Sequence, residues 1–386
     1  MRQAAESCRS SIGVSIIAAV SEIFVGSQVQ HKLSNSFLIA AGLALCAALT
    51  ACAPKTKTIE VVVGGTAAKG TAGEASWLKF QRDAEAAGNG QITMRMLIHG
   101  ELGSEDQIVS GLRRGRVQFA NLSALIASTI VPEVALIYTP YLFDSDAEAD
   151  YVFDNFLTSE YRKLFAERGL EFIAWYELGA QQIWSRDKPI LTPDDMRGVR
   201  FRIAASKSAE LLGQALHADL IPLGYADIIP SLQTGLIAAG ENGVTLYSRT
   251  GIAPEAPHLS MTNHSLAMSV IVADKRWWDK QPENVRKILR DEFPAEPEIR
   301  RAVREEIRTD LAAADELGFK VYNLSDEQRK QWSDATRSTH AALIRSIGGQ
   351  SQRIYDLAIA GKAAYASEVK RTAVQTQPAS ASANTE

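Results

Sequence analysis

The sequence predicts an α/β protein with two domains, in which mainly parallel strands alternate with helices. Two observations lead to this prediction. Short β-branched or alternating apolar runs recur along the chain, and a segment with helical spacing separates each run from the next, as expected when helices cover the faces of a parallel sheet. The length agrees, because removal of an export signal at residues 1–51 from the 386-residue chain leaves 335 residues, which favours two domains over one.

The first third of the chain shows this alternation most clearly. A β-branched run beginning at Ile59 predicts a buried first strand. Apolar residues at helical spacing then predict a helix that ends at Gly88, and Ser104 with Gln107 has the spacing of a capping box that begins another helix. The predicted strands are residues 59–63, 92–98 and 117–120, and the predicted helices are residues 72–87 and 104–114.

The rest of the chain continues the pattern and adds one long helix. Apolar residues at steps of four from Ile299 predict this helix at residues 298–317, ending before Gly318. Ser325 begins a further helix with a second capping box. Residues 371–386 end the chain in a polar segment that predicts a disordered tail. The predicted strands here are residues 170–176, 200–203, 236–240 and 265–273.

The N-terminal segment has the pattern of a secretory signal. The basic flank at His31 and Lys32 precedes an apolar run at residues 37–49, which is too short for a membrane span and is followed by Leu-Thr-Ala-Cys ending at Cys52. This tetrapeptide resembles a bacterial lipobox, in which the cysteine becomes the lipidated first residue; a signal cleavage site with a chance cysteine is the alternative. Because residues 1–30 precede the basic flank, either translation begins near Val29 or the signal is unusually long.

Composition and motifs argue against several classes of function. The formal net charge of −4 disfavours a strongly basic surface for nucleic acid. Cys8 and Cys46 lie in the segment expected to be removed, so we expect no internal disulfide in the mature chain. The histidines fall in no pattern typical of metalloproteases, serine hydrolases or cysteine nucleophiles, and His264 is expected to form structural hydrogen bonds. We therefore expect no enzyme activity and no cofactor.

Two segments in the middle of the chain carry the functional signal. After Gly198, a predicted strand places apolar side chains on one face and the guanidinium groups of Arg200 and Arg202 on the other. Residues 232–242 follow, with the sequence Leu-Gln-Thr-Gly-Leu-Ile-Ala-Ala-Gly-Glu-Asn. A strand with two arginines is by itself often a solvated edge, but it can also bind an anion. The pair of segments resembles the extracytoplasmic solute-binding proteins of TRAP transporters, which import small organic acids with an ion gradient, and the resemblance covers residues 58 to about 360.

The resemblance implies roles for four residues around this strand. Arg202 matches the carboxylate-binding arginine of the family. Asn242 matches an asparagine that hydrogen-bonds the ligand or that arginine. Glu241, beside it, is expected to orient Arg202 as a supporting partner. Tyr225 lies where relatives place an aromatic residue against the ligand, although a core aromatic residue that caps the following helix fits the sequence equally well.

Three further residues complete the predicted ligand-binding site. Relatives often have an arginine in the segment at residues 179–185, where this chain has Gln181, so the resemblance implies one positive charge fewer and favours a monocarboxylate with hydroxyl, carbonyl or aromatic groups. Trp184 is expected either as an apolar wall of the site or in the core. Thr66 follows the first strand, at the sheet edge where open α/β sheets bind ligands, unless it is only a turn residue.

The resemblance also implies a two-lobed, periplasmic-binding-protein-like fold, with a mainly parallel sheet flanked by helices in each lobe and a long bracing helix. Lobe 1 is expected at residues 58–178 and 268–295, and lobe 2 at residues 179–267 and 296–370. The implied protein is a monomer in the periplasm or cell envelope, anchored by lipid, that delivers a carboxylate to the integral membrane subunits of a TRAP permease. A lipoprotein of the same fold that presents its ligand to a signalling receptor is the alternative.

Overall fold

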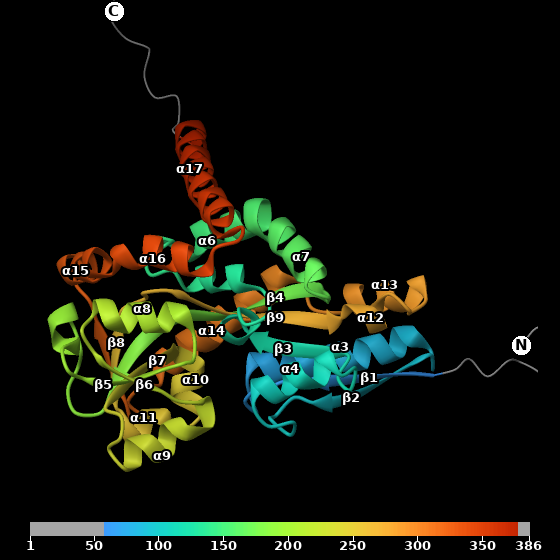
Figure 1. Cartoon of the computed structure of the whole chain (residues 1–386), viewed down its shortest axis with the longest axis horizontal. Coiled ribbons are helices and arrows are strands. Elements are labelled where there is room, and N and C mark those ends of the chain that lie inside the picture. The colour runs from blue at the N-terminus through green and yellow to red at the C-terminus, as the bar shows by residue number, and fades with distance from the viewer. Residues whose placement is uncertain (1–57, 377–386) are drawn as a thin grey trace, which may run out of the picture. The chain divides into compact units, whose positions relative to one another are not determined.

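Within residues 58–376, ten strands form a single mixed sheet that helices flank on both faces, which confirms the α/β class (Figure 1). The computed structural model describes residues 58–376, so the predicted cleavage and lipidation at Cys52 lie outside the described residues. Eight strands follow the order β2-β1-β3-β9-β4-β7-β5-β6, and β8 joins β4 to β10. The strands are β1 (Ile59–Gly64), β2 (Ile92–Leu97), β3 (Phe119–Ser123), β4 (Leu170–Ser185), β5 (Arg200–Ile203), β6 (Asp219–Pro222), β7 (Ala239–Gly243), β8 (His258–Met261), β9 (Leu266–Asp274) and β10 (Lys320–Asn323).

Several helices begin with a side-chain cap, and two of these caps were predicted from the sequence. The Thr71 side chain accepts the N–H of Glu74 at the start of α3, and the predicted capping boxes at Ser104 and Ser325 are both present. The principal helices are α3 (Ala72–Gly88), α4 (Glu105–Arg113), α6 (Asp146–Val152), α7 (Thr158–Glu167), α8 (Lys207–Ala215), α9 (Ile228–Gln233), α10 (Val244–Arg249), α13 (Glu283–Asp291), α14 (Glu296–Ala312), α15 (Asp326–Thr336), α16 (Ser338–Ile347) and α17 (Ser351–Thr376). Shorter helices are α5 (Ala124–Ala127), α11 (Ile252–Glu255) and α12 (Lys275–Trp278).

Parallel pairing occurs at the two ends of the main strand order and between β8 and β10, which lie off it. At one end β1 pairs in parallel with β2 and β3, and at the other β5 pairs in parallel with β6 and β7. Between them β9 and β4 run antiparallel to each other and to their outer neighbours β3 and β7. The carboxyl ends of the parallel strands at each end of the sheet are therefore the places where loops can carry a binding site.

Apolar cores cover both faces of the sheet. Along β9, Val270 packs in the core cluster that contains Trp175, whereas its neighbour Ile271 packs on the opposite face. Ile183 and Trp184 of β4 likewise belong to different clusters. Since neighbouring strand residues point to opposite faces, this division shows that the central strands are covered on both sides.

The long strand β4 changes its partner next to Gly179. It pairs with β9 as far as Ala180 and with β7 from Gln181 onward. Gly179 has φ +86°, a conformation that glycine adopts without strain. A Cβ atom at this position would lie 2.5 Å from Cδ1 of Ile307 on α14. Both the backbone conformation and the close approach of α14 therefore require glycine where the pairing changes.

Several predicted boundaries differ from the structure. The strand predicted at residues 117–120 is β3, shifted to Phe119–Ser123. The strand predicted at residues 170–176 continues to Ser185, because β7 and β8 pair with its second half. The strand predicted at residues 236–240 is β7, shifted to Ala239–Gly243. The helix predicted at residues 298–317 is α14, which ends at Ala312 and is followed by hydrogen-bonded turns up to Gly318.

A further difference concerns the end of the chain. Residues 371–376 were predicted as part of a disordered tail, but they form the last turns of α17, since this segment lacks the glycine or proline that would end a helix. The lobe boundaries stay a prediction, because the hydrogen-bonded sheet runs without a break from β2 to β6.

Candidate functional site

Arg202 lies on β5 with its side chain buried, being 5% exposed. Its Nε and Nη2 atoms donate to the carbonyl oxygen of Leu223 at 3.1 and 2.9 Å. Burial lowers the pKa of the guanidinium, and the negative charge of Glu241 opposes that shift. Within residues 58–376 no carboxylate forms an ion pair with Arg202. A buried cation without an ion-pair partner is suited to receive an anion, because desolvated charges are stable only when they are paired.

Glu241 and Asn242 lie inside β7, and not beyond its end as the predicted strand implied. Residues before Ala239 still belong to the preceding turn, where the N–H of Ile237 donates to the carbonyl oxygen of Ser231. The antiparallel pairing with β4 instead carries the strand on to Gly243. This pairing places both side chains directly beside β4, which a turn would not have done.

The partner of Glu241 is a histidine and not Arg202. Its Oε2 atom lies 2.8 Å from Nε2 of His264, whose Nδ1 atom lies 2.8 Å from the hydroxyl of Thr262. His264 and Glu241 are only 1% and 4% exposed. The expectation that Glu241 orients Arg202 by direct contact is therefore not met, because the carboxylate is already bound to the ring and acts on Arg202 through its charge alone.

Asn242 is held in place by Trp184. The indole N–H of Trp184 donates to Oδ1 of Asn242 at 2.9 Å, and the Trp184 ring is fully buried in a core cluster. Of the two alternatives for Trp184, the structure shows the core position, so the ring offers no surface to a ligand. This hydrogen bond occupies the side-chain carbonyl of Asn242, so its NH₂ group is the part that can donate a hydrogen bond to a ligand.

Gln181 lies at the point where β4 begins to pair with β7, opposite Gly243. Its side chain is 6% exposed, and its Oε1 atom is buried without a hydrogen-bond partner among the described residues. Its backbone N–H and carbonyl bond to Ser265 and His264, at 2.8 and 3.3 Å. An unpaired buried acceptor is costly, which makes this amide a candidate to accept a hydrogen bond from a ligand hydroxyl.

Tyr225 and Thr66 differ in how closely they approach Arg202. Tyr225 follows β6, its ring is 42% exposed, and its hydroxyl lies 2.5 Å from the hydroxyl of Thr250. Burial raises the pKa of the Tyr225 hydroxyl, and the positive charge of Arg202 opposes that rise. Thr66 is exposed beyond β1, where it forms an isolated bridge with His99. The structure therefore groups Arg202 with the other predicted residues near the ends of β4, β5 and β7, and no contact within residues 58–376 brings Thr66 to them.

One further polar residue, Asn121, was not predicted from the sequence; it lies near the carboxyl ends of the parallel strands β1 and β3. Asn121 of β3 has a buried Oδ1 atom without a partner, and it lies beside Gly65 at the end of β1. The predicted strand ended at residue 120, so Asn121 was placed in a loop. A polar residue at the carboxyl end of an apolar strand was the available signal.

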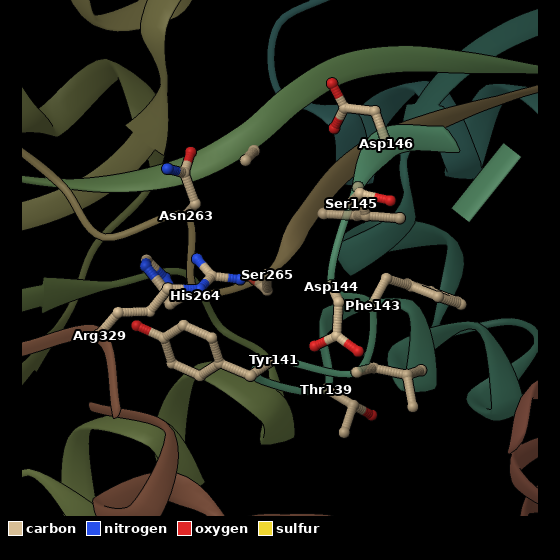
Figure 2. A pocket seen from close by; sticks show the side chains of 13 residues that line it. Thr139, Tyr141, Phe143, Asp144, Ser145, Asp146, Asn263, His264, Ser265 and Arg329 are labelled. Carbon is tan, nitrogen blue, oxygen red and sulfur yellow. The ribbon is translucent and has the colours of Figure 1, made fainter. Parts of the chain in front are cut away.

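A pocket of about 320 Å³ lies next to this group of residues and is shown in Figure 2. His264 connects the two places, because it lines the pocket and also contacts Glu241. The guanidinium of Arg329 lies over the ring of Tyr141, 5.2 Å from its centroid, on one wall. None of the seven residues predicted to bind the ligand lines this pocket.

Residues 58–376 offer neither a helix that could cross a membrane nor a group of side chains that could hold a metal ion. No helix there combines the length and the apolar character that crossing a membrane requires. No group of three or more His, Cys, Asp or Glu side chains there is arranged so that it could hold a metal ion.

Comparison with known proteins identifies the family. The sequence profile of the bacterial extracellular solute-binding proteins, family 7, matches residues 63–346. The chain belongs to this family. Its members are the solute-binding proteins of TRAP systems and not enzymes, which confirms both the resemblance and the expected class of protein.

Individual family members show how far this chain has diverged. The ectoine-binding periplasmic protein of Halomonas elongata is 26% identical over 276 residues, which are 69% of this chain and 80% of that protein. The C4-dicarboxylate-binding periplasmic protein of Vibrio cholerae is 27% identical over 264 residues, 67% of this chain and 78% of that protein. A sugar-acid-binding protein of Advenella mimigardefordensis, solved with galactonate, shares the fold with a TM-score of 0.74 at 21% identity, covering 79% of this chain and 99% of its own.

Proposed function

We propose that this family member binds a small organic acid outside the cytoplasmic membrane and pairs the carboxylate of that acid with Arg202. The observation that carries the proposal is the state of the Arg202 side chain, which is 5% exposed, bonded only to a backbone carbonyl and not paired with an acid within residues 58–376. A guanidinium presents a planar fork that matches two carboxylate oxygens. The bond to Leu223 fixes the direction of that fork before a ligand arrives.

The neighbouring groups favour a ligand with one carboxylate and additional polar groups. Asn242 can donate from its NH₂ group, Gln181 has a free acceptor, and the exposed ring of Tyr225 can cover an apolar side of the ligand. Gln181 is neutral, so a second carboxylate would find no second cation at this position. Relatives named for binding ectoine, C4-dicarboxylates and galactonate support the general class of ligand and leave the choice within it open.

In this proposal the ligand is carried to a membrane permease. Binding draws two lobes together around the site, and the closed protein docks on the integral membrane subunits of a TRAP transporter. Lipidation of Cys52 keeps the protein at the membrane. Thr66, at the end of β1, would reach the ligand only through this closure, since it contacts none of the other predicted residues in the described part of the structure.

The test is a binding panel. Small molecules that co-purify with the protein are first identified by mass spectrometry. Monocarboxylates, hydroxy acids, dicarboxylates and the corresponding neutral amides are then compared by thermal shift and calorimetry. We expect stabilisation by acids and none by their amides. Equal stabilisation by an acid and its amide would contradict the proposal, because recognition would then not depend on the carboxylate.

A further inference from the structure

A groove beside β2 is rimmed by arginines. It has a volume of about 410 Å³ and lies between α4 and the face of β1 and β2 that carries Val62 and Leu97. Its rim includes Arg95 from β2 and, from the turn after α4, Arg114 and Arg116. Arg113 is exposed next to them. We call these four residues the arginine rim.

The arginine rim is not neutralised by the protein. Within residues 58–376, none of the four guanidinium groups forms an ion pair or a side-chain hydrogen bond, and all four residues are exposed. Several arginines elsewhere are paired; Arg300 and Arg304, for example, bind Asp154 and Asp150 at 2.7 Å. Because the whole chain has a net charge of −4, four unpaired cations around one groove form a local positive surface on an acidic protein.

The strand register places the arginine rim near the point where the chain enters the fold. Arg95 is opposite Val62, the fourth residue of β1. Residues 113–116 lead directly into β3, and the N–H of Gln118 donates to the carbonyl oxygen of Val62 at 2.9 Å. Both parts of the rim therefore lie beside Val62, three residues after the first residue of β1.

The proposed lipid anchor is close to this position along the chain. Ile59, the first residue of β1, is seven positions after Cys52, and Lys55 and Lys57 are among the six residues between them. At about 3.5 Å per residue, a chain of this length spans at most about 25 Å. An anchored Cys52 would therefore keep the start of β1, and the arginine rim with it, within reach of the lipid headgroups.

We propose that the arginine rim docks the protein on anionic phospholipid headgroups. Arginine binds phosphate oxygens through two parallel hydrogen bonds, and basic residues near an anionic membrane each add roughly fivefold to binding. The short connection to the anchor raises the effective concentration of headgroups at the rim. Docking fixes which face of the anchored protein is turned to the membrane. The inference rests on the proposed anchoring at Cys52, whereas the binding of lipid by the rim can be measured without it.

The experiment uses the mature chain from residue 52 with Cys52→Ser, so that no acyl chain is present; residues 57–386 form a compact unit of their own. Sedimentation measures binding to vesicles of phosphatidylcholine with 30% phosphatidylglycerol and to vesicles of phosphatidylcholine alone. We expect binding only to the anionic vesicles, weakening as salt is raised. The double variant R114Q/R116Q should bind about 25-fold more weakly.

The matched control is R197Q/R337Q, which removes the same charge from two exposed arginines, at 61% and 72% side-chain exposure, outside the rim. We expect it to bind like the parent, and both double variants should keep the parent melting temperature. Equal binding to the two kinds of vesicle, or equal loss in the control, would overturn the proposal. So would binding of a polyglutamate peptide without binding of vesicles, which would indicate an acidic protein as the partner. Calorimetry of the rim variant with the organic acid separates this result from the proposed function, because affinity for the acid should not change.

Discussion

Replacing Arg202 with alanine tests the candidate site at its central residue. The side chain is buried on β5, and two of its N–H groups bind the carbonyl oxygen of Leu223. The substitution removes the only cation proposed to meet the carboxylate, and it also leaves that carbonyl without two of its donors. The two consequences are separable, because the first changes ligand affinity and the second changes the stability of the free protein.

The structure sets the size of the expected effect. Arg202 has five N–H donors, and one on Nε and one on Nη2 bind the carbonyl oxygen of Leu223. The end of the guanidinium therefore keeps donors for two carboxylate oxygens. Two charge-assisted bonds contribute about 1.5–3 kcal/mol each, and removal of one partner from a buried charge pair costs about 2–5 kcal/mol. The overlap, about 3–5 kcal/mol, corresponds to a loss of affinity between about 100-fold and several thousand-fold.

Calorimetry with the acid that binds the parent protein measures this loss. Arg202→Lys should recover only part of the affinity, since an ammonium cannot reproduce the fork. Arg200→Ala is the matched control, because Arg200 lies on the same strand but is exposed, and it should cost less than about threefold. Equal and small losses for both alanine variants would refute the reasoning, because Arg202 would then be a structural cation satisfied by Leu223.

Three other changes test separate parts of the argument. Gln181→Arg should raise affinity for dicarboxylates over monocarboxylates by about tenfold, since one added charge-assisted bond requires a second anion; an unchanged ranking in a thermal-shift panel would place Gln181 outside the pocket. Cys52→Ser should move the protein from the membrane fraction to the soluble fraction or block its processing, and an unchanged membrane fraction would mean that the anchor lies elsewhere. The Nε2 atom of His340 lies 2.7 Å from the carbonyl of Pro140, and burial lowers the pKa of this side chain. The unfolded chain therefore binds the proton more tightly than the folded chain does. As pH falls below about 7 towards the pKa of the folded state, the stability of the protein should fall. In urea unfolding at pH 7 and pH 5.5, His340→Gln should lose less stability than the parent; an equal loss would assign the pH dependence to another group.

Local sequence patterns predicted the elements that carry Arg202. The strand at residues 200–203 has the predicted bounds. Its alternation of basic and apolar residues predicted that Arg202 lies on the face opposite Phe201 and Ile203. The capping boxes at Ser104 and Ser325 were also predicted correctly. These features depend on residues within a few positions of one another, and side-chain spacing alone determines them.

Features that depend on distant partners were predicted less well. The strand β4 extends to Ser185 because β7 and β8 pair with it, although Gly179 interrupts its local pattern. Glu241 binds His264, which lies 23 positions further along the chain. Which strands become neighbours decides whether Glu241 binds Arg202 or a residue from another strand. The residue spacing around Glu241 and around Arg202 does not contain that information.

The long helix α14 bonds to elements on both sides of the change of pairing in β4. Glu296 accepts the backbone N–H of Trp175, in the first half of β4, at 3.0 Å, and Asp310 pairs with Arg249 of α10, the helix that follows β7, at 2.6 Å. Arg249 in turn donates to the carbonyl of Gly70, beyond β1, at 3.0 Å. These bonds lie along one helix and next to the change of pairing in β4, whereas Thr66 and Arg202 are joined by no contact of their own in the described residues. If the two sides of the proposed site move together when an acid binds, α14 and the middle of β4 are the elements about which they would turn.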